Sequence, residues 1–235
     1  MAEVYRLYTE AHYNNATKTT GAGQAQSWDT SRALGGLAGD IKLTKASSQT
    51  QMAYVTSPTF SLIGETRLTA RFYIDAADYT IPTGRDSTIF HPMSASTTDT
   101  AYLVYVANLS GSPYIRVTSF ADGFTSSNFG YIALPSGPHY IDIVLNRATS
   151  DVAGDASIYA YVDGVLGYTR ENYDFYDTFP LVDRVRFGIS SANDNNILGD
   201  LYLGKLLITN DANPIGPIST YDPSLFNTLR RRRRL

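Results

Sequence analysis

The stretch Ala156-Ser-Ile-Tyr-Ala-Tyr-Val-Asp-Gly-Val-Leu166 decides the fold class of this 235-residue chain. Ile158, Ala160 and Val162 alternate with more polar neighbours, which is the pattern of a β-strand that buries one face. Asp163-Gly164 then supplies the residue pair that tight hairpin turns favour. The stretch therefore predicts two antiparallel strands joined by a short turn.

The same alternation recurs through residues 40–210. It is clear in the segments 40–44, 67–74, 114–118, 140–146 and 184–189, and turn residues separate these segments at 82–84, 110–113, 121–123 and 135–138. Strands at this spacing, without a long helical pattern between them, indicate an all-β sandwich or jelly roll. We expect about a dozen strands in two antiparallel sheets. The predicted core contains Leu68, Phe72, Ile143, Leu145, Ile158, Val162, Val185 and Phe187.

Composition divides the chain into three parts. Residues 1–39 are rich in Asn, Thr, Gly and Gln beyond a short first strand, which predicts an N-terminal arm and edge strand. Residues 40–210 form the predicted sandwich. Residues 211–235 contain Pro214, Pro217 and Pro223 and end in a run of arginines, which predicts an extended C-terminal arm with a basic tail.

Whole-chain composition also excludes several classes of protein. The 18 Tyr and 10 Phe favour sheet over helix. Zero cysteines exclude a disulfide framework and a cysteine-based zinc site. The first residues lack the pattern of a signal peptide, and no apolar run is long enough for a membrane span. We therefore expect assembly in a cytoplasm and no membrane partner.

The order of these segments resembles the laminin G-like and concanavalin A-like jelly-roll family over residues 40–210. The resemblance rests on Thr66–Ile74 followed by Ser87–Phe90, on His139–Leu145, on the Ala156–Leu166 hairpin, and on Arg186–Ile189 followed by Gly199–Thr209. It implies a two-sheet antiparallel sandwich, and it makes sugar binding a function to consider.

The sequence predicts no catalytic site. Glycoside hydrolysis requires two carboxylates across a cleft, whereas Glu171, Asp174 and Asp177 have the wrong spacing and lie in an expected connection. His12, His91 and His139 lack the local spacing of metal ligands. We therefore predict that the chain is not an enzyme and holds no catalytic metal.

Calcium and glycans remain candidate ligands. Asn193-Asp194-Asn195-Asn196 offers oxygen ligands for calcium, but such loops are more often turns, and no cofactor is expected. Tyr173, Phe175 and Tyr176 lie together and are candidate glycan-binding residues. The favoured alternative is that these rings cover a sheet edge or a subunit interface.

The basic tail is the clearest candidate for partner binding. It comprises Arg230, Arg231, Arg232, Arg233 and Arg234; without them, 14 basic and 22 acidic residues leave a net charge of −8. Leu225 and Phe226 precede the run and could add an apolar anchor. The tail could be solvated, contact nucleic acid, or hold carboxylates of a neighbouring subunit through its guanidinium forks.

These features together favour a non-enzymatic structural protein of a virus particle. We interpret the chain as a bacteriophage capsid decoration (cement) protein, or another exterior virion protein, that docks through its termini. Its partners would be the major capsid protein or copies of itself, in a homo-oligomer or larger assembly, and its location the virion. The alternative is a carbohydrate-binding module or adhesin, and the third interpretation is a glycosidase.

Deleting residues 225–235 tests the docking prediction. The melting temperature should stay nearly unchanged, because the tail follows the predicted sandwich, while attachment to the particle should be lost and should weaken with added salt in the intact chain. Normal assembly of the shortened chain, measured by co-sedimentation, would show that the tail is a solvated appendage.

Overall fold

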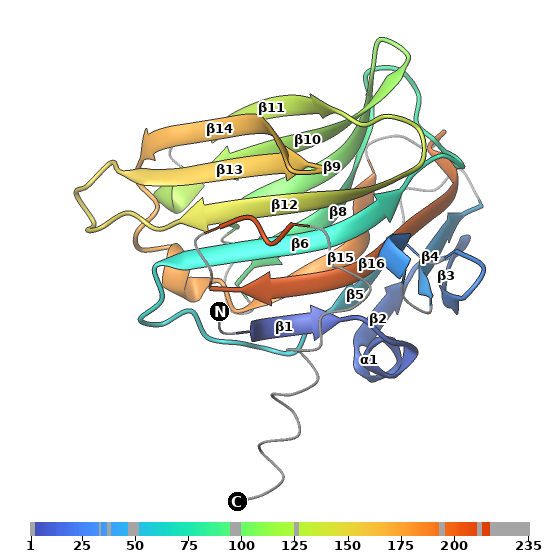
Figure 1. Cartoon of the computed structure of the whole chain (residues 1–235), viewed down its shortest axis with the longest axis horizontal. Coiled ribbons are helices and arrows are strands. Elements are labelled where there is room, and N and C mark those ends of the chain that lie inside the picture. The colour runs from blue at the N-terminus through green and yellow to red at the C-terminus, as the bar shows by residue number, and fades with distance from the viewer. Residues whose placement is uncertain are drawn as a thin grey trace, which may run out of the picture.

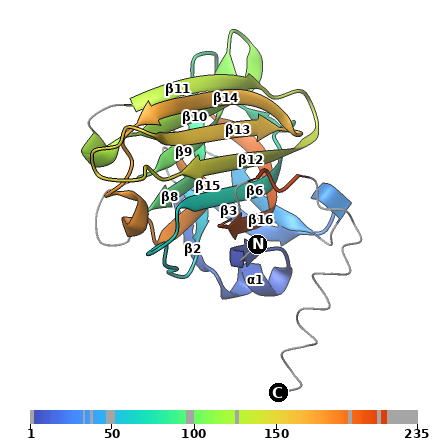
Figure 2. The ribbon, with the colours of Figure 1, turned by 60° about the vertical axis from the view of Figure 1, so that its left-hand side comes forward.

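The computed structural model describes residues 3–32, 34–36, 39–46, 52–94, 100–124, 127–192, 196–210 and 213–216. They form two antiparallel sheets packed face to face, one nine-stranded and one seven-stranded. Figure 1 shows the nine-stranded sheet in front, and the turned view in Figure 2 shows strands of the seven-stranded sheet behind it. The predicted all-β sandwich is confirmed.

The nine-stranded sheet is organised around its longest strand, β16 (Leu198–Thr209). Its main order is β14–β13–β12–β6–β16–β4–β3, and β1 and β7 also pair with β16. The other members are β14 (Val165–Tyr173), β13 (Ala156–Val162), β12 (Pro138–Asn146), β6 (Arg67–Asp75), β4 (Asp40–Lys45), β3 (Gln24–Asp29), β1 (Glu3–Leu7) and β7 (Tyr79–Thr80).

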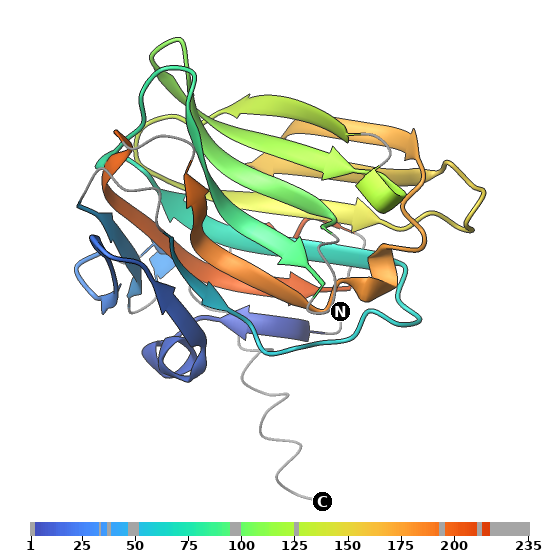
Figure 3. The same ribbon diagram turned by 180° about the vertical axis from the view of Figure 1, so that it is seen from behind.

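The seven-stranded sheet lies behind it and faces the viewer in Figure 3. Its order is β11 (Ser127–Ala133), β10 (Ser112–Phe120), β9 (Tyr102–Leu109), β8 (Asp86–Met93), β15 (Arg184–Ala192), β5 (Ala53–Thr56) and β2 (Thr17–Thr20). The short helices are α1 (Glu10–Asn15), η1 (Leu34–Gly36), η2 (Asp122–Phe124) and η3 (Phe179–Leu181). In the described ranges, no helix has the length and apolar character to cross a membrane.

The core lies between the sheets, and all eight side chains predicted for it are buried. Phe72 of β6 lies at its centre, with its ring 5.4 Å from that of Phe90 and 5.5 Å from that of Phe187. These three rings come from both sheets, so they join the layers through aromatic contacts as well as through buried area.

The hairpin predicted from Ala156–Leu166 is present between β13 and β14. Asp163 and Gly164 have φ values of 51° and 79°, and Val162 pairs with Val165 across the turn. Positive φ at both central residues matches the twist of the flanking strands.

The predicted N-terminal arm over residues 1–39 is wrong for most of its length. β1 and β3 belong to the nine-stranded sheet, and β2 belongs to the seven-stranded sheet. The side-chain amide of Gln26 in β3 donates to the carbonyl of Thr19 and to Oγ1 of Thr20 in β2, both at 2.7 Å. Composition obscured these strands because edge strands with water-facing sides carry polar residues.

The predicted C-terminal arm is described only at residues 213–216. This short segment, red in Figure 1, lies across the outer face of the nine-stranded sheet in front of β12 and β6. The remainder of residues 211–235 lies outside the described residues.

Replacing Phe72 with Ala should lower the free energy of unfolding by about 3–5 kcal/mol, because it removes buried area and leaves a cavity between the sheets. Chemical denaturation measures this loss. Val165→Ala is the control, since Val165 is 70% exposed and its truncation should change stability little. Equal stabilities of the two variants would contradict the core assignment.

Candidate functional site

The structure corrects the glycan site suggested at Tyr173, Phe175 and Tyr176. Tyr173 and Phe175 are buried in the core, and their ring centroids lie 6.3 Å apart. Tyr176 is half-buried beneath the guanidinium of Arg147, 3.7 Å from its ring centroid. A ring in the core has no free face on which a pyranose could stack, so these residues do not form an open sugar site.

A half-buried carboxylate holds the loop that contains Tyr176. Asp122 accepts hydrogen bonds from the backbone N–H groups of Tyr176, Asp177 and Thr178 at 2.7, 2.9 and 2.8 Å. Burial raises the pKa of Asp122, but these hydrogen bonds outweigh it, so the pKa lies below its usual value. The loop is fixed by this carboxylate, which the local sequence did not reveal.

The other predicted sites fall on residues that the structure does not describe. These are Leu225, Phe226 and Arg230–Arg234 of the basic tail, and Asn193, Asp194 and Asn195 of the candidate calcium loop. In the part of the chain that is described, no three His, Cys, Asp or Glu side chains are grouped as metal ligands would be. Tail docking and the absence of a cofactor stay predictions.

The outer face of the seven-stranded sheet carries a row of five residues that crosses five strands. Arg116 of β10 pairs in register with Tyr131 of β11 and with Tyr105 of β9. Tyr105 pairs with Thr88 of β8, which in turn pairs with Ser191 of β15. We call Tyr131, Arg116, Tyr105, Thr88 and Ser191 the cross-strand row.

An aromatic patch extends the row at the β11 edge. Phe129 and Tyr131 are 61% and 36% exposed. The ring of Tyr131 packs edge-on against Phe129 at 5.9 Å and against Tyr114 at 6.1 Å. Because the rings support one another, they present a rigid apolar surface to water at the open edge of the sheet.

Arg116 is held in one position by two partners. Its guanidinium lies 3.8 Å from the ring centroid of Tyr105 and forms an ion pair of 2.7 Å with Asp86. Burial raises the pKa of Asp86, and the charges of Arg116 and Arg85 oppose that rise. The stacked and paired guanidinium offers its remaining N–H groups in a fixed direction.

The hydroxyl end of the row is also ordered. Oγ1 of Thr88 and Oγ of Ser191 are 2.7 Å apart, and Ser191 is exposed. Nearby on β8, burial and then the charge of Arg186 lower the pKa of His91 to about 4. The His91 imidazole is therefore neutral near pH 7, and its Nε2 lies 2.8 Å from Oγ1 of Thr100.

Sequence reasoning missed this face, although one signal was present. Tyr105, Tyr114, Arg116 and Tyr131 occupy the positions that alternate with core residues, and four large side chains at water-facing positions are unusual enough to attract notice. Their meeting depends on strand order and register, which the sequence does not provide.

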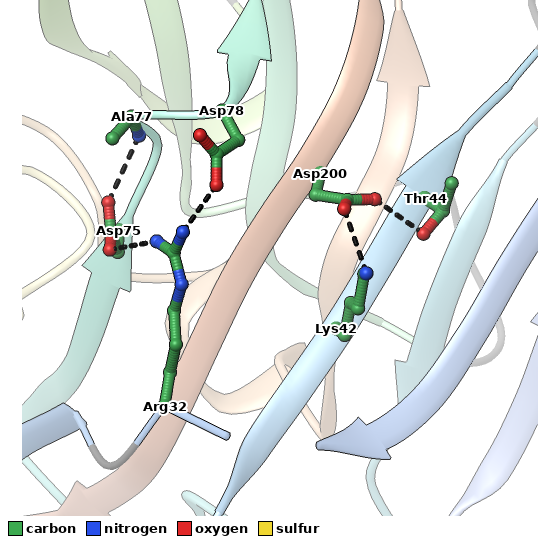
Figure 4. A network of polar contacts seen from close by, with 7 residues as sticks. All are labelled: Arg32, Lys42, Thr44, Asp75, Ala77, Asp78 and Asp200. Carbon is green, nitrogen blue, oxygen red and sulfur yellow. Dashed lines mark hydrogen bonds and ion pairs between the residues drawn. The ribbon is translucent and has the colours of Figure 1, made fainter. Parts of the chain in front are cut away.

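The outer face of the nine-stranded sheet is different, because charged side chains there pair with one another. Figure 4 shows Arg32 between Asp75 and Asp78, and Asp200 bound to Lys42 and Thr44. The guanidinium of Arg32 also lies 4.2 Å from the ring centroid of Tyr202. The Arg32 contacts fasten the segment that precedes η1 onto the sheet, whereas the Asp200 contacts join β16 to β4.

Beneath η1, the same face buries an acid and a base. Asp40 is fully buried and accepts the N–H of Leu34 at 2.8 Å, while Lys205 lies 5.3 Å from the ring centroid of Tyr73. Burial raises the pKa of Asp40 to about 6 and lowers that of Lys205 to about 8. Within the described ranges, Oδ1 of Asp40 and Nζ of Lys205 have no hydrogen-bond partner.

This arrangement of two antiparallel sheets defines a jelly-roll β-sandwich, and solved structures of that class match nearly the whole chain. Endo-β-1,4-glucuronan lyase from the fungus Trichoderma reesei matches with a TM-score of 0.62 and 11% identity, covering 93% of this chain and 100% of the lyase. The cellulose induced protein Cip1 matches with a TM-score of 0.59 and 14% identity, covering 86% of this chain and 94% of Cip1.

A toxin domain shares the same fold. The receptor binding domain of botulinum neurotoxin C/D mosaic serotype matches with a TM-score of 0.56 and 11% identity, covering 98% of this chain but 51% of that domain. No protein family model matches the sequence, and no curated protein matches it. At these identities the likeness shows the fold, so function must be argued from the chain's own residues.

The buried Asp40 predicts a pH dependence of stability. Its folded-state pKa of about 6 lies above the ordinary aspartate value of 3.8, so the folded protein binds more protons than the unfolded chain between these two pH values. This group therefore makes stability fall as pH rises from about 4 to about 6.

Asp40→Asn should remove that contribution. The free energy of unfolding of the variant, minus that of the wild type, should rise by about 1–3 kcal/mol between pH 4 and pH 7. Urea denaturation at stepped pH measures it. Asp200→Asn is the control, and its free-energy difference from the wild type should change with pH in the opposite direction. The reason is that hydrogen bonds from Lys42 and Thr44 outweigh burial and place the Asp200 pKa below its usual value. Parallel profiles for wild type and Asp40→Asn would contradict the assignment.

Proposed function

We propose that the chain is a carbohydrate-binding protein that holds an extended saccharide along the cross-strand row of the seven-stranded sheet. The observation that carries the proposal is the register of that row, which places Tyr131, Arg116 and Tyr105 side by side on three neighbouring strands. An exposed ring, a fixed guanidinium and a hydroxyl pair thus follow one line across the sheet.

The chemistry of the row suits a sugar chain. A pyranose has apolar C–H faces that pack on aromatic rings, and hydroxyl groups that accept and donate hydrogen bonds. Tyr131 supplies an accessible ring, Arg116 supplies oriented donors, and Ser191 supplies a hydroxyl at the far end. Four strand spacings give the row a length of about 19 Å, which is enough for several linked sugar rings.

Binding suits the row better than hydrolysis. The five residues of the row include no carboxylate, and the adjacent Asp86 is already paired with Arg116 at 2.7 Å. Hydrolysis of a glycosidic bond uses two carboxylates on opposite sides of the bond. The proposal therefore assigns saccharide binding, and no hydrolysis, to the row. That the whole chain is not an enzyme stays a prediction from the sequence.

One structure with the same fold supports the proposal. The glucuronan lyase, as its name states, acts on a polysaccharide and matches this chain over its full length. The virion interpretation rests on the sequence, chiefly on the basic tail, which lies outside the described residues. Docking to a capsid stays a prediction from the sequence.

Affinity electrophoresis through gels containing hydroxyethyl cellulose, xylan or glucuronan tests the proposal. At least one polysaccharide should retard the wild-type chain. Tyr131→Ala should weaken that binding about threefold to tenfold, the loss expected for one aromatic contact. Arg116→Ala should weaken it further, because it removes both the oriented N–H donors and the guanidinium that stacks on Tyr105.

Tyr159→Ala is the matched control, because Tyr159 lies on the nine-stranded sheet, where its hydroxyl donates to Glu171. Its binding should equal that of the wild type. The proposal fails if no polysaccharide retards the wild-type chain, or if the Tyr131 and Tyr159 variants lose affinity equally.

A further inference from the structure

A buried charge pair on the other sheet holds a piece of peptide backbone. Arg71 of β6 and Asp142 of β12 lie opposite one another in register on the outer face of the nine-stranded sheet. Their exposed fractions are 1% and 0%, although this face points away from the core. Residues Asn213–Gly216 lie over the pair (Figure 1, red segment).

The pair holds this segment through its backbone. Asp142 accepts the N–H of Ile215 at 3.3 Å and the N–H of Gly216 at 3.0 Å. Arg71 donates from Nη1 to the carbonyl oxygen of Gly216 and from Nη2 to the hydroxyl of Tyr8 at 3.3 Å. We call Arg71 and Asp142 the backbone clamp, because these three contacts with the segment reach main-chain atoms.

The occupant's conformation limits which sequences fit the clamp. Gly216 has a φ of 71°, which L side chains rarely adopt, so a residue other than Gly is strained there. Pro214 restricts its own φ and lacks an N–H group that would need a partner. The clamp therefore favours an extended segment with Gly at the position that contacts both Arg71 and Asp142.

The buried charges of the clamp require hydrogen-bond partners, but the segment that supplies them buries little of its own surface. A buried carboxylate and guanidinium are costly to leave without hydrogen bonds. Yet Asn213 is exposed, and Pro214, Ile215 and Gly216 are only partly buried, so little apolar area holds the segment in place. Among the described residues, three backbone hydrogen bonds hold the segment on the clamp, and another segment that makes the same bonds can replace it.

We propose that the backbone clamp is a docking site for the Asn213–Gly216 segment of a second copy of this chain, which exchanges with the chain's own segment. Each copy carries both a clamp and a segment that fits it, so the exchange needs no other partner. Each contact formed between copies replaces the same contact within one copy. The proposal concerns the nine-stranded sheet and is independent of saccharide binding on the opposite face.

Two full-length variants separate the segment from the clamp. Gly216→Val strains the segment and leaves the clamp intact, which makes an acceptor. Asp142→Asn weakens the clamp and leaves the segment intact, which makes a donor. When the two are mixed, native mass spectrometry should detect about tenfold more heterodimer than dimer in either variant alone, because only the mixture combines an intact clamp with a free intact segment.

The controls test whether the clamp itself makes the contact. The double variant Gly216→Val/Asp142→Asn should not pair with the acceptor, and the capped tetrapeptide acetyl-Asn-Pro-Ile-Gly-amide should dissociate the heterodimer. Circular dichroism melting establishes that each variant is folded. If either single variant does not fold, Ile215→Pro, which removes one N–H donor, replaces the acceptor and Arg71→Gln replaces the donor.

Folded variants that form no heterodimer would overturn the proposal and leave the segment as a brace within one chain. Heterodimer that persists in the presence of excess tetrapeptide would also overturn it, because the contact would then lie elsewhere. Unchanged polysaccharide retardation of both variants is expected in every case, so failure here is distinguishable from failure of the carbohydrate proposal.

Discussion

The hydrogen bonding of β16 is the constraint on which the nine-stranded sheet depends. This strand pairs with β4 and β1 along one edge and with β6 and β7 along the other. A bulge between Gly204 and Leu207, where Lys205 has a φ of 53°, interrupts its register with β6. At Gly204 a Cβ would lie 1.9 Å from Oδ1 of Asp40, so the buried carboxylate requires glycine there.

The two outer faces differ in how they treat polar groups. On the nine-stranded sheet, η1 covers Asp40, and residues 213–216 cover Arg71 and Asp142. These buried side chains form hydrogen bonds with the backbone of the segments that cover them. On the seven-stranded sheet, Tyr131 remains exposed and Arg116 is oriented but only partly covered. A ligand from solution therefore finds preformed groups on one face and an occupied site on the other.

The sequence predicted the core residues, which depend on local alternation within a strand. It did not predict which residues meet across strands, because that depends on strand register. Leu68, Phe72 and Ile158 could be assigned to the core because each lies at the apolar position of an alternating strand. The meeting of Tyr131 and Arg116 could not, because it requires the pairing of β11 with β10. The glycan prediction for Tyr173 and Phe175 was wrong because Tyr173 belongs to β14, where it pairs with Ala156, and because both rings pack in the core. The distant Asp122 holds the loop that follows them.

The pairing of β1 with β16 has a consequence for the order in which the chain can fold. The first strand begins at Glu3, and its partner positions run from Leu206 to Thr209, so nearly the whole chain separates them. A protein is synthesised from its N-terminus, and such non-local pairing slows folding because a long loop must close first. Residues 3–7 leave the ribosome long before residues 206–209, so they must stay unpaired with β16 until that strand has been made.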